Sequence, residues 1–191
     1  MKSSRLLLAG IVAASLCAAS SKADEVSPIQ ISLVNPIQIV NENTSVKGLR
    51  INLIYGVNQD VSGLDLGLVN RTHGIQSGHQ LGLVNYVSGG LVGAQYGLVN
   101  YNEGDIKGSQ AGIVNYNMGD THGYMYGLVN YNIAHLQGMQ AGIWNYTDSV
   151  DGFQLGLVNV TRELQGLQIG LLNIASGKEN WRILPLVNAN W

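Results

Sequence analysis

The chain has 191 residues, of which 12 % are charged and 46 % are hydrophobic, and it carries 25 glycines and a formal net charge of −2. Charged residues are about half as frequent as usual, and glycine is nearly twice as frequent. This composition excludes a disordered tail, which combines few apolar residues with high net charge. It also argues against a nucleic-acid-binding protein, which needs a surplus of Lys and Arg. Glycine follows no strict three-residue period, so collagen is excluded.

Residues 1–23 have the pattern of a secretory signal peptide. Lys2 and Arg5 precede an apolar run over residues 6–19, and small residues precede a cleavage point after Ala23. The run is too short for a membrane-spanning helix. The pattern therefore predicts an exported protein that is cut after Ala23.

Cys17 offers a second way to process this segment, because a cysteine after an apolar run can be lipidated. Leu16, directly before it, is a poor fit to a lipoprotein box, which wants a small residue there. Cleavage after Ala23 instead leaves no cysteine, and so no disulfide. It also removes three of the 10 basic residues and none of the 12 acidic ones, which leaves a formal charge of −5 that disfavours anionic surfaces.

The rest of the chain is an internal repeat. A GLVN tetrad or a close variant recurs in steps of 15, 15, 15, 15, 15, 14 and 14 residues. Each copy ends on an asparagine: Asn70, Asn85, Asn100, Asn115, Asn130, Asn145, Asn159 and Asn173. Degenerate copies extend the array at residues 28–35, at residues 48–55, where Asn52 takes the glycine position and Tyr55 the asparagine position, and at residues 185–188.

Numbered from its first glycine, the unit reads G-x-Q-[LYA]-G-[LI]-V-N-Y-N-x-G-x-[LIV]-x. Position 3 is glutamine in most units, with Asp65 and Met125 as the exceptions. Position 8 is the asparagine, and position 9 is tyrosine in five successive units: Tyr86, Tyr101, Tyr116, Tyr131 and Tyr146.

The unit predicts an all-β repeat protein. Two glycines in each unit would destabilise a helix by about 2 kcal/mol relative to alanine. Positions 2, 4 and 6 are apolar or small and alternate with Gly, Gln and Gly, which is the period of a strand. Stretches such as residues 102–105 are rich in turn-forming residues. Each unit is therefore a strand followed by a turn.

The favoured architecture is a β-solenoid with one coil per repeat, in which equivalent residues stack about 4.8 Å apart. Positions 4 and 6, such as Leu66 with Leu68 and Leu81 with Leu83, would then fill the core. The asparagines at position 8 would form a structural ladder of amide hydrogen bonds. Recurrence of one polar residue at one position in every copy follows from such a ladder.

The alternative is an antiparallel meander, open or closed into a β-barrel. Residues 117–120 suit a four-residue hairpin loop. Position 4 also alternates over two units, as Tyr96, Ala111, Tyr126 and Ala141, which opposed strands would produce and large-over-small stacking of coils would produce equally. A membrane-spanning barrel fits less well because its strands need a longer apolar face, although the terminal Trp191 is typical of such chains.

The domain organisation follows from the array. We expect a signal peptide at 1–23, N-terminal capping strands at 24–47, the β-repeat array at 48–177 and a C-terminal capping strand at 178–191. Pro28, Pro36 and Pro185 all lie in the outermost copies. Proline cannot donate to a strand ladder and is tolerated at an edge.

The GxQxGLVN units and the lead-in at residues 48–56 resemble the bacterial surface-repeat family of exported GLVN-repeat proteins. The resemblance covers residues 28–191. It implies a secreted or cell-surface location in a bacterium, and it supplies neither catalytic residues nor a ligand.

The sequence offers little for catalysis. His73, His79, His122 and His135 occupy four different positions of the unit and form no row, whereas a zinc site needs three or four convergent ligands. The nine-residue calcium repeat, the nucleophile elbow and the phosphate-binding loop are all missing. We therefore expect no enzyme activity, no cofactor and no metal.

The tyrosine row is the one candidate binding stripe, for a glycan or a protein. Its alternative is a packing role in which the rings cover neighbouring glycines. The sequence thus predicts a non-enzymatic, exported bacterial surface or envelope protein that acts as a structural or adhesive scaffold, with an outer-membrane barrel or pore as the alternative. Its expected location is the cell surface, the outer membrane or the extracellular space. Its expected partner is an envelope protein or glycan, with no nucleic acid, and it has the outer membrane as a second candidate contact.

Overall fold

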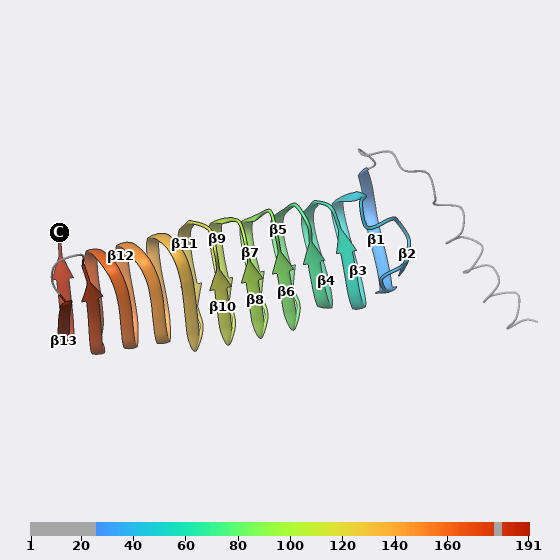
Figure 1. Ribbon diagram of the computed structural model, residues 1–191. Coiled ribbons are helices and arrows are strands. Elements are labelled where there is room, and N and C mark those ends of the chain that lie inside the picture. Colours follow the sequence, from blue (N-terminus) through green and yellow to red (C-terminus); the bar gives the residue numbers. More distant parts are fainter. Residues whose placement is uncertain (1–25, 178–180) are drawn as a thin grey trace, which may run out of the picture.

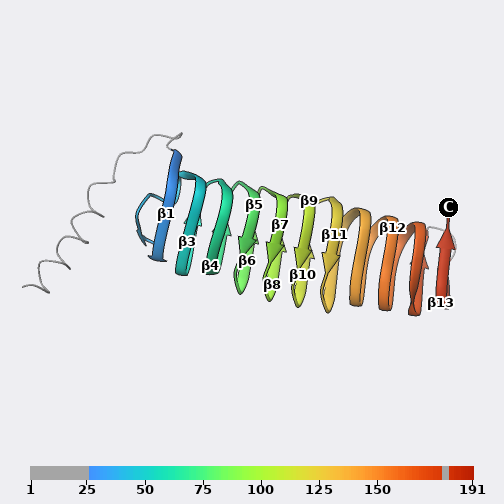
Figure 2. The ribbon, with the colours of Figure 1, turned by 180° about the vertical axis from the view of Figure 1, so that it is seen from behind.

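The chain winds as an all-β solenoid of about eight turns, which confirms the favoured architecture (Figure 1). The computed structural model describes residues 26–177 and 181–191. Cys17 and the predicted cleavage point after Ala23 lie outside these residues. The turns stack into a rod with β1 near one end and β13 at the other, as both views show (Figures 1 and 2). No helix in the described part of the chain has the length and apolarity to cross a membrane.

The N-terminal strands are β1 (Val26–Val34), β2 (Ile37–Gln38), β3 (Ser45–Asn58) and β4 (Val61–Thr72). The coils of the array form β5 (Ile75–Leu81), β6 (Val84–Val87), β7 (Gly90–Tyr96), β8 (Val99–Asn102), β9 (Asp105–Ala111), β10 (Val114–Asn117) and β11 (Thr121–Tyr126). The last coils form one continuous strand, β12 (Val129–Ser176), and β13 (Trp181–Asn190) closes the sheet.

Successive coils pair in parallel and in the register of the repeat. Gly93 lies opposite Gly108, and Asn100 lies opposite Asn115. The antiparallel meander is therefore wrong for the array. The two-unit alternation at position 4 is large-over-small stacking instead, because Tyr126 pairs with Ala111 on one side and Ala141 on the other.

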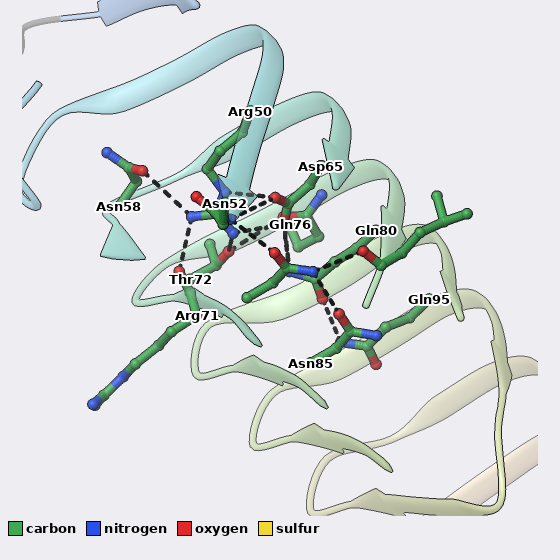
Figure 3. A network of polar contacts seen from close by, with 12 residues as sticks. Arg50, Asn52, Asn58, Asp65, Arg71, Thr72, Gln76, Gln80, Asn85 and Gln95 are labelled. Carbon is green, nitrogen blue, oxygen red and sulfur yellow. Dashed lines mark hydrogen bonds and ion pairs between the residues drawn. The ribbon is translucent and has the colours of Figure 1, made fainter. Parts of the chain in front are cut away.

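A typical coil has a long strand over positions 13 to 4 and a short strand over positions 7 to 10. β7 and β8 illustrate the two strands. Two bends join them, one at positions 5 and 6 and the other at positions 11 and 12. Figure 3 shows these bends in the N-terminal coils.

The interior is different from the expected one. Leu68 and Leu83, predicted as core, are 47 % and 48 % exposed, Leu81 is 39 % exposed and Leu66 is half-buried. Positions 3, 8, 10 and 14 point inward instead. Because side chains alternate along a strand, inward positions 3 and 8 force positions 4 and 7 to the outside.

Most of the apolar part of the interior comes from position 14, with Val87 at position 10 and Met125 at position 3 as additions. The members of position 14 include Leu91, Ile106 and Leu136, none of which has an exposed side chain. The larger part of the buried set is amide and hydroxyl side chains. The solenoid thus has a largely polar interior.

Both ends depart from the predicted register. At the N-terminal end, Asn52 pairs with Gly67 as predicted, but Tyr55 pairs with Val69, and Gly56 takes the place opposite Asn70. An irregularity between Asn52 and Tyr55 shifts the copy by one residue. At the C-terminal end, residues 185–188 do not continue the array, because β13 runs antiparallel to β12 and places Asn188 opposite Gln168.

Candidate functional site

The eight asparagines at position 8 form one buried, hydrogen-bonded row. The side-chain amide of each donates to the side-chain oxygen of the next, from Asn70 to Asn173, over 2.8 to 2.9 Å. Their side chains are completely buried. Asn52 adds a further rung by donating to Asn70 over 2.7 Å.

Each ladder asparagine also anchors the bend between the two strands. The second amide hydrogen of Asn85 reaches the backbone oxygen of Tyr96 over 2.8 Å, and that of Asn100 reaches Ala111 over 2.9 Å. Both amide hydrogens therefore have acceptors. Only asparagine combines this reach with a donor and an acceptor, which is the physical reason for its recurrence at position 8.

The glutamines at position 3 form a second ladder that runs in the opposite direction. Gln95 donates to Gln80 over 2.7 Å and Gln110 donates to Gln95 over 2.8 Å, so the donors point to the N-terminal end. The ladder resumes at the C-terminal coils, where Gln168 donates to Gln154 over 2.7 Å.

Asp65 ends the glutamine ladder on its N-terminal side, where the side-chain amide of Gln80 needs an acceptor. Gln80 donates to its carboxylate over 2.7 Å, and Arg50 in the preceding coil makes two further bonds, through Nε over 2.7 Å and Nη2 over 2.5 Å (Figure 3). Both partners of this ion pair are fully buried. At the other end, Asn188 of β13 donates to Gln168 over 2.8 Å.

The glycines leave room for this stacking. At Gly127, a Cβ would lie 2.6 Å from the backbone oxygen of Gly112 and 2.8 Å from the amide nitrogen of Asn115. At Gly123 the backbone has φ +143°, a conformation that side chains disfavour. The glycine excess therefore follows from close approach of neighbouring coils and their asparagine ladder.

The five position-9 tyrosines form a continuous stack on the outside of the short strands. Neighbouring ring centroids are 4.5 to 5.3 Å apart, and ring planes differ by 1° to 14°. The guanidinium of Arg71 lies 5.0 Å from the ring of Tyr86 and extends the stack by a cation–π contact. All five rings remain partly accessible, so the rings cover one another while still presenting their edges to solvent.

The hydroxyls of this tyrosine stack point away from the bend at positions 5 and 6, which we call the GLVN bend. Tyr86 donates to Glu103 over 2.5 Å, and Tyr146 donates to Asp148 over 2.6 Å. The hydrogen bond to Asp148 is the main cause that raises the pKa of Tyr146 above its ordinary value of 10.0. Burial, followed by the charge of Glu103, raises the pKa of Tyr101.

The structure does not bring the histidines together. Within residues 26–177 and 181–191, no three His, Cys, Asp or Glu side chains are placed to hold a metal ion. An open hollow at the C-terminal end is lined by His135, Arg162, Glu163 and Arg182, beside the inward-facing Leu164. The other coils carry different residues at the positions of these side chains. The hollow is therefore a feature of the C-terminal end and not of the repeat.

Comparison with known proteins adds no relative. No protein-family model matches the chain, and neither a curated protein nor a solved structure matches it significantly. The candidate site is therefore defined by geometry alone, as two internal amide ladders, one external tyrosine stack and an apolar bend.

Two features of the site were missed by sequence reasoning. The ion pair of Arg50 and Asp65 has a signal in the sequence, because both residues occupy position 3, one repeat apart. The exposed GLVN bend also has a signal in the sequence, because position 8 is an asparagine in all eight copies and position 7 is an apolar residue in all of them. Opposite faces of one strand carry these two positions, so a buried asparagine requires an exposed valine.

Proposed function

We propose that the protein is a non-enzymatic scaffold of the bacterial surface or envelope. The observation that carries the proposal is the uninterrupted, in-register stack of near-identical coils, which repeats the same side chains along the rod. In such a stack each coil contacts only the coils directly before and after it, and the result is an extended surface. A repeated surface suits binding to a repeated or elongated partner.

The tyrosine stack is the part of this scaffold that we propose for adhesion. Stacked rings of defined spacing present aromatic edges along several coils, and aromatic side chains contribute large contact area at low entropic cost. An envelope glycan or protein is the proposed partner class. Export is inferred from residues 1–23 and from the family resemblance.

The test has two parts. Fractionation of the producing bacterium should find the chain in the medium, at the cell surface or in the outer membrane, and recovery in the cytoplasm contradicts the proposal. Replacement of Tyr101, Tyr116 and Tyr131 by serine should abolish binding to envelope components while the circular dichroism spectrum stays unchanged. Undiminished binding by this folded variant removes the tyrosine stack from the proposal.

A reproducible turnover of any polymer by the purified chain would contradict the non-enzymatic role. Hydrolysis of envelope polysaccharide is the activity to assay, because a long repeated surface also suits a polysaccharide-processing protein. The expected result is no product above a boiled control.

A further inference from the structure

The solenoid has an apolar corner that consists of positions 4, 6 and 7 of every coil from Leu66 to Leu172. Each of these positions holds Leu, Ile, Val, Ala, Tyr or Trp in all eight coils, and none is charged. The position-6 side chains, which include Leu83 and Leu128, are 46 % to 65 % exposed. Soluble monomers rarely expose an apolar surface that continues through eight coils, so we expect a partner to cover this corner.

The opposite bend carries charged residues, alongside exposed side chains of other kinds. Glu103, Asp105, Asp120 and Arg162 lie at positions 11 to 13 and are exposed. The rod is therefore amphipathic along its length, with the apolar corner on one side and these charged turns on the other. An element with this distribution is typical of a surface that lies at a boundary between water and an apolar phase.

The backbone of the apolar corner is paired between coils. The amide of Leu83 donates to Leu68 over 2.9 Å, that of Leu98 to Leu83 over 2.9 Å, and that of Val99 to Leu83 over 3.0 Å. From inside, the asparagine ladder donates to the position-4 carbonyls, such as that of Tyr96. Since these groups already have partners, the corner can leave water at little polar cost, which hydrocarbon requires of any backbone.

The tyrosine stack lies directly beside this corner. Positions 7 and 9 are the two outward positions of the short strand. Each tyrosine ring at position 9 therefore lies next to the apolar side chain at position 7 of the same coil. The hydroxyls of Tyr86 and Tyr146 bond to Glu103 and Asp148, on the side of the charged turns. Aromatic rings with one apolar and one wet end are enriched at membrane interfaces in this orientation.

We propose that the apolar corner inserts into the surface of a lipid bilayer, so that the rod lies on the membrane with its tyrosine stack at headgroup level. The corner is a ridge where the two strand faces meet. Lipid chains adapt to a ridge, whereas two copies that meet ridge to ridge would touch mainly along position 6. The negative formal charge of −5 expected for the processed chain favours a zwitterionic lipid surface over an anionic one.

This inference adds a lipid partner to the proposed envelope scaffold, and its test can fail separately. Vesicle binding concerns the purified chain, whereas the proposed function concerns its location and its glycan or protein partner. A chain at the cell surface that ignores vesicles overturns only the lipid proposal. A vesicle-binding chain recovered in the cytoplasm overturns only the proposed location.

The first experiment is flotation of the full chain with phosphatidylcholine vesicles. The edge variant replaces Leu83, Leu98 and Leu128 by serine. The control variant replaces Ile75, Val92 and Met118 by serine, which are 40 % to 51 % exposed at positions 11 to 15, away from the corner. All chains keep the same N-terminal sequence, so that residues 1–25 contribute equally to binding.

The original chain and the control variant should float with the vesicles, and the edge variant should bind about tenfold less or weaker still, because it loses three apolar side chains. Equal flotation of the two variants, or failure of the original chain to float, overturns the proposal. Sedimentation velocity without lipid tests whether a second copy of the chain covers the corner instead. If the original chain and the control variant are oligomers, the edge variant is a monomer and none of the chains floats with vesicles, the corner is a contact between copies and the proposal is overturned.

Trp144 provides a readout that does not depend on the serine variants. It occupies position 7 of the corner and is 44 % exposed. Replacing Trp181 and Trp191 by phenylalanine leaves it as the single tryptophan. With phosphatidylcholine vesicles its emission should shift to shorter wavelength, and lipids that carry a quencher near the headgroup should quench it. An unchanged spectrum at saturating lipid overturns the proposal.

Discussion

The side-chain oxygen of Gln110 faces Met125, the residue that occupies the glutamine position of the next coil. Among the described residues this buried oxygen has no hydrogen-bond partner. On the far side of Met125, the side-chain amide of Gln140 meets a sulfur over 3.6 Å where the other rungs offer an amide oxygen, and it also donates to the backbone oxygen of Tyr146 over 3.2 Å. Met125 therefore divides the glutamine ladder into two parts.

Replacing Met125 by glutamine should join the two parts. The new amide would donate to Gln110 and accept from Gln140, in the register that the other rungs use. We expect a gain in the free energy of unfolding of about 1 kcal/mol, which is typical of a hydrogen bond that satisfies a buried group. Urea unfolding followed by circular dichroism measures it.

Met125→Leu is the matched control, because it keeps an apolar side chain of similar size and leaves Gln110 without a partner. We expect it to be neutral or slightly destabilising. If the leucine variant proves as stable as the glutamine variant, the ladder bond contributes nothing at this coil.

The buried pair of Arg50 and Asp65 gives the second prediction. Asp65→Asn leaves the guanidinium of Arg50 buried without its countercharge, so the free energy of unfolding should fall by about 3–5 kcal/mol. The double variant Arg50→Gln with Asp65→Gln restores the position-3 consensus in both coils. It should recover most of the loss, because both glutamines can then continue the ladder toward Gln30.

Thermal unfolding of Arg50→Gln, of Asp65→Gln and of the double variant that combines them measures the coupling between the two residues. A double variant that is less stable than either single variant would show that the pair has a role that glutamine cannot replace.

The repeat made much of this fold predictable. Steps of 15 and 14 residues require equivalent positions to stack if the chain forms a solenoid, and the recurrence of Asn100 and its equivalents predicts the ladder. Asp65 and Met125 stood out in the sequence as exceptions to glutamine. Their consequences, an ion pair and an interrupted ladder, depend on which way position 3 faces.

That direction could not be derived from the apolar pattern. The rule that apolar side chains face the core assigns Leu68 and Leu83 to the interior, whereas the structure turns them outward. The position-8 amides stack in register and satisfy one another from coil to coil, so a polar interior becomes stable here through periodicity. The reversal of β13 was equally hidden, because the spacing of Asn188 from Asn173 imitates a further repeat.

The tyrosine stack gives a prediction on pH. Tyr101 and Tyr146 have a raised pKa in the folded chain, so folding favours their neutral form. The associated stabilisation is complete below the ordinary tyrosine pKa of 10.0 and is lost as the pH rises through the higher folded value. The chain should therefore become less resistant to urea at strongly alkaline pH.

Ultraviolet absorbance at the phenolate band follows the ionisation directly. Asp148→Asn removes the charge that Tyr146 faces and weakens the main cause of its shift, so the pKa of Tyr146 should move down toward the ordinary value. Tyr146→Phe identifies the component of the titration that belongs to this residue. Identical titrations of the original chain and the Asp148 variant would contradict this assignment.

Asn130 and Asn132 provide the sharpest test of the asparagine ladder, because both are fully buried in the same coil of β12. Asn130 accepts from Asn115 and donates to Asn145 and to the backbone of Ala141, each over 2.8 to 3.0 Å. Asn132 lies in the position-10 row, where Thr147 and Val87 occur in other coils.

Asn130→Thr shortens the side chain and removes both amide donors, so the side chain of Asn115 loses its acceptor and that of Asn145 loses its donor. We expect the free energy of unfolding to fall by about 2–4 kcal/mol. Asn132→Thr introduces a residue that its own row already accommodates, and it should cost less than about 1 kcal/mol. Urea midpoints measured on both variants decide the matter, since equal losses would mean that burial of an amide, rather than its place in the ladder, sets the stability.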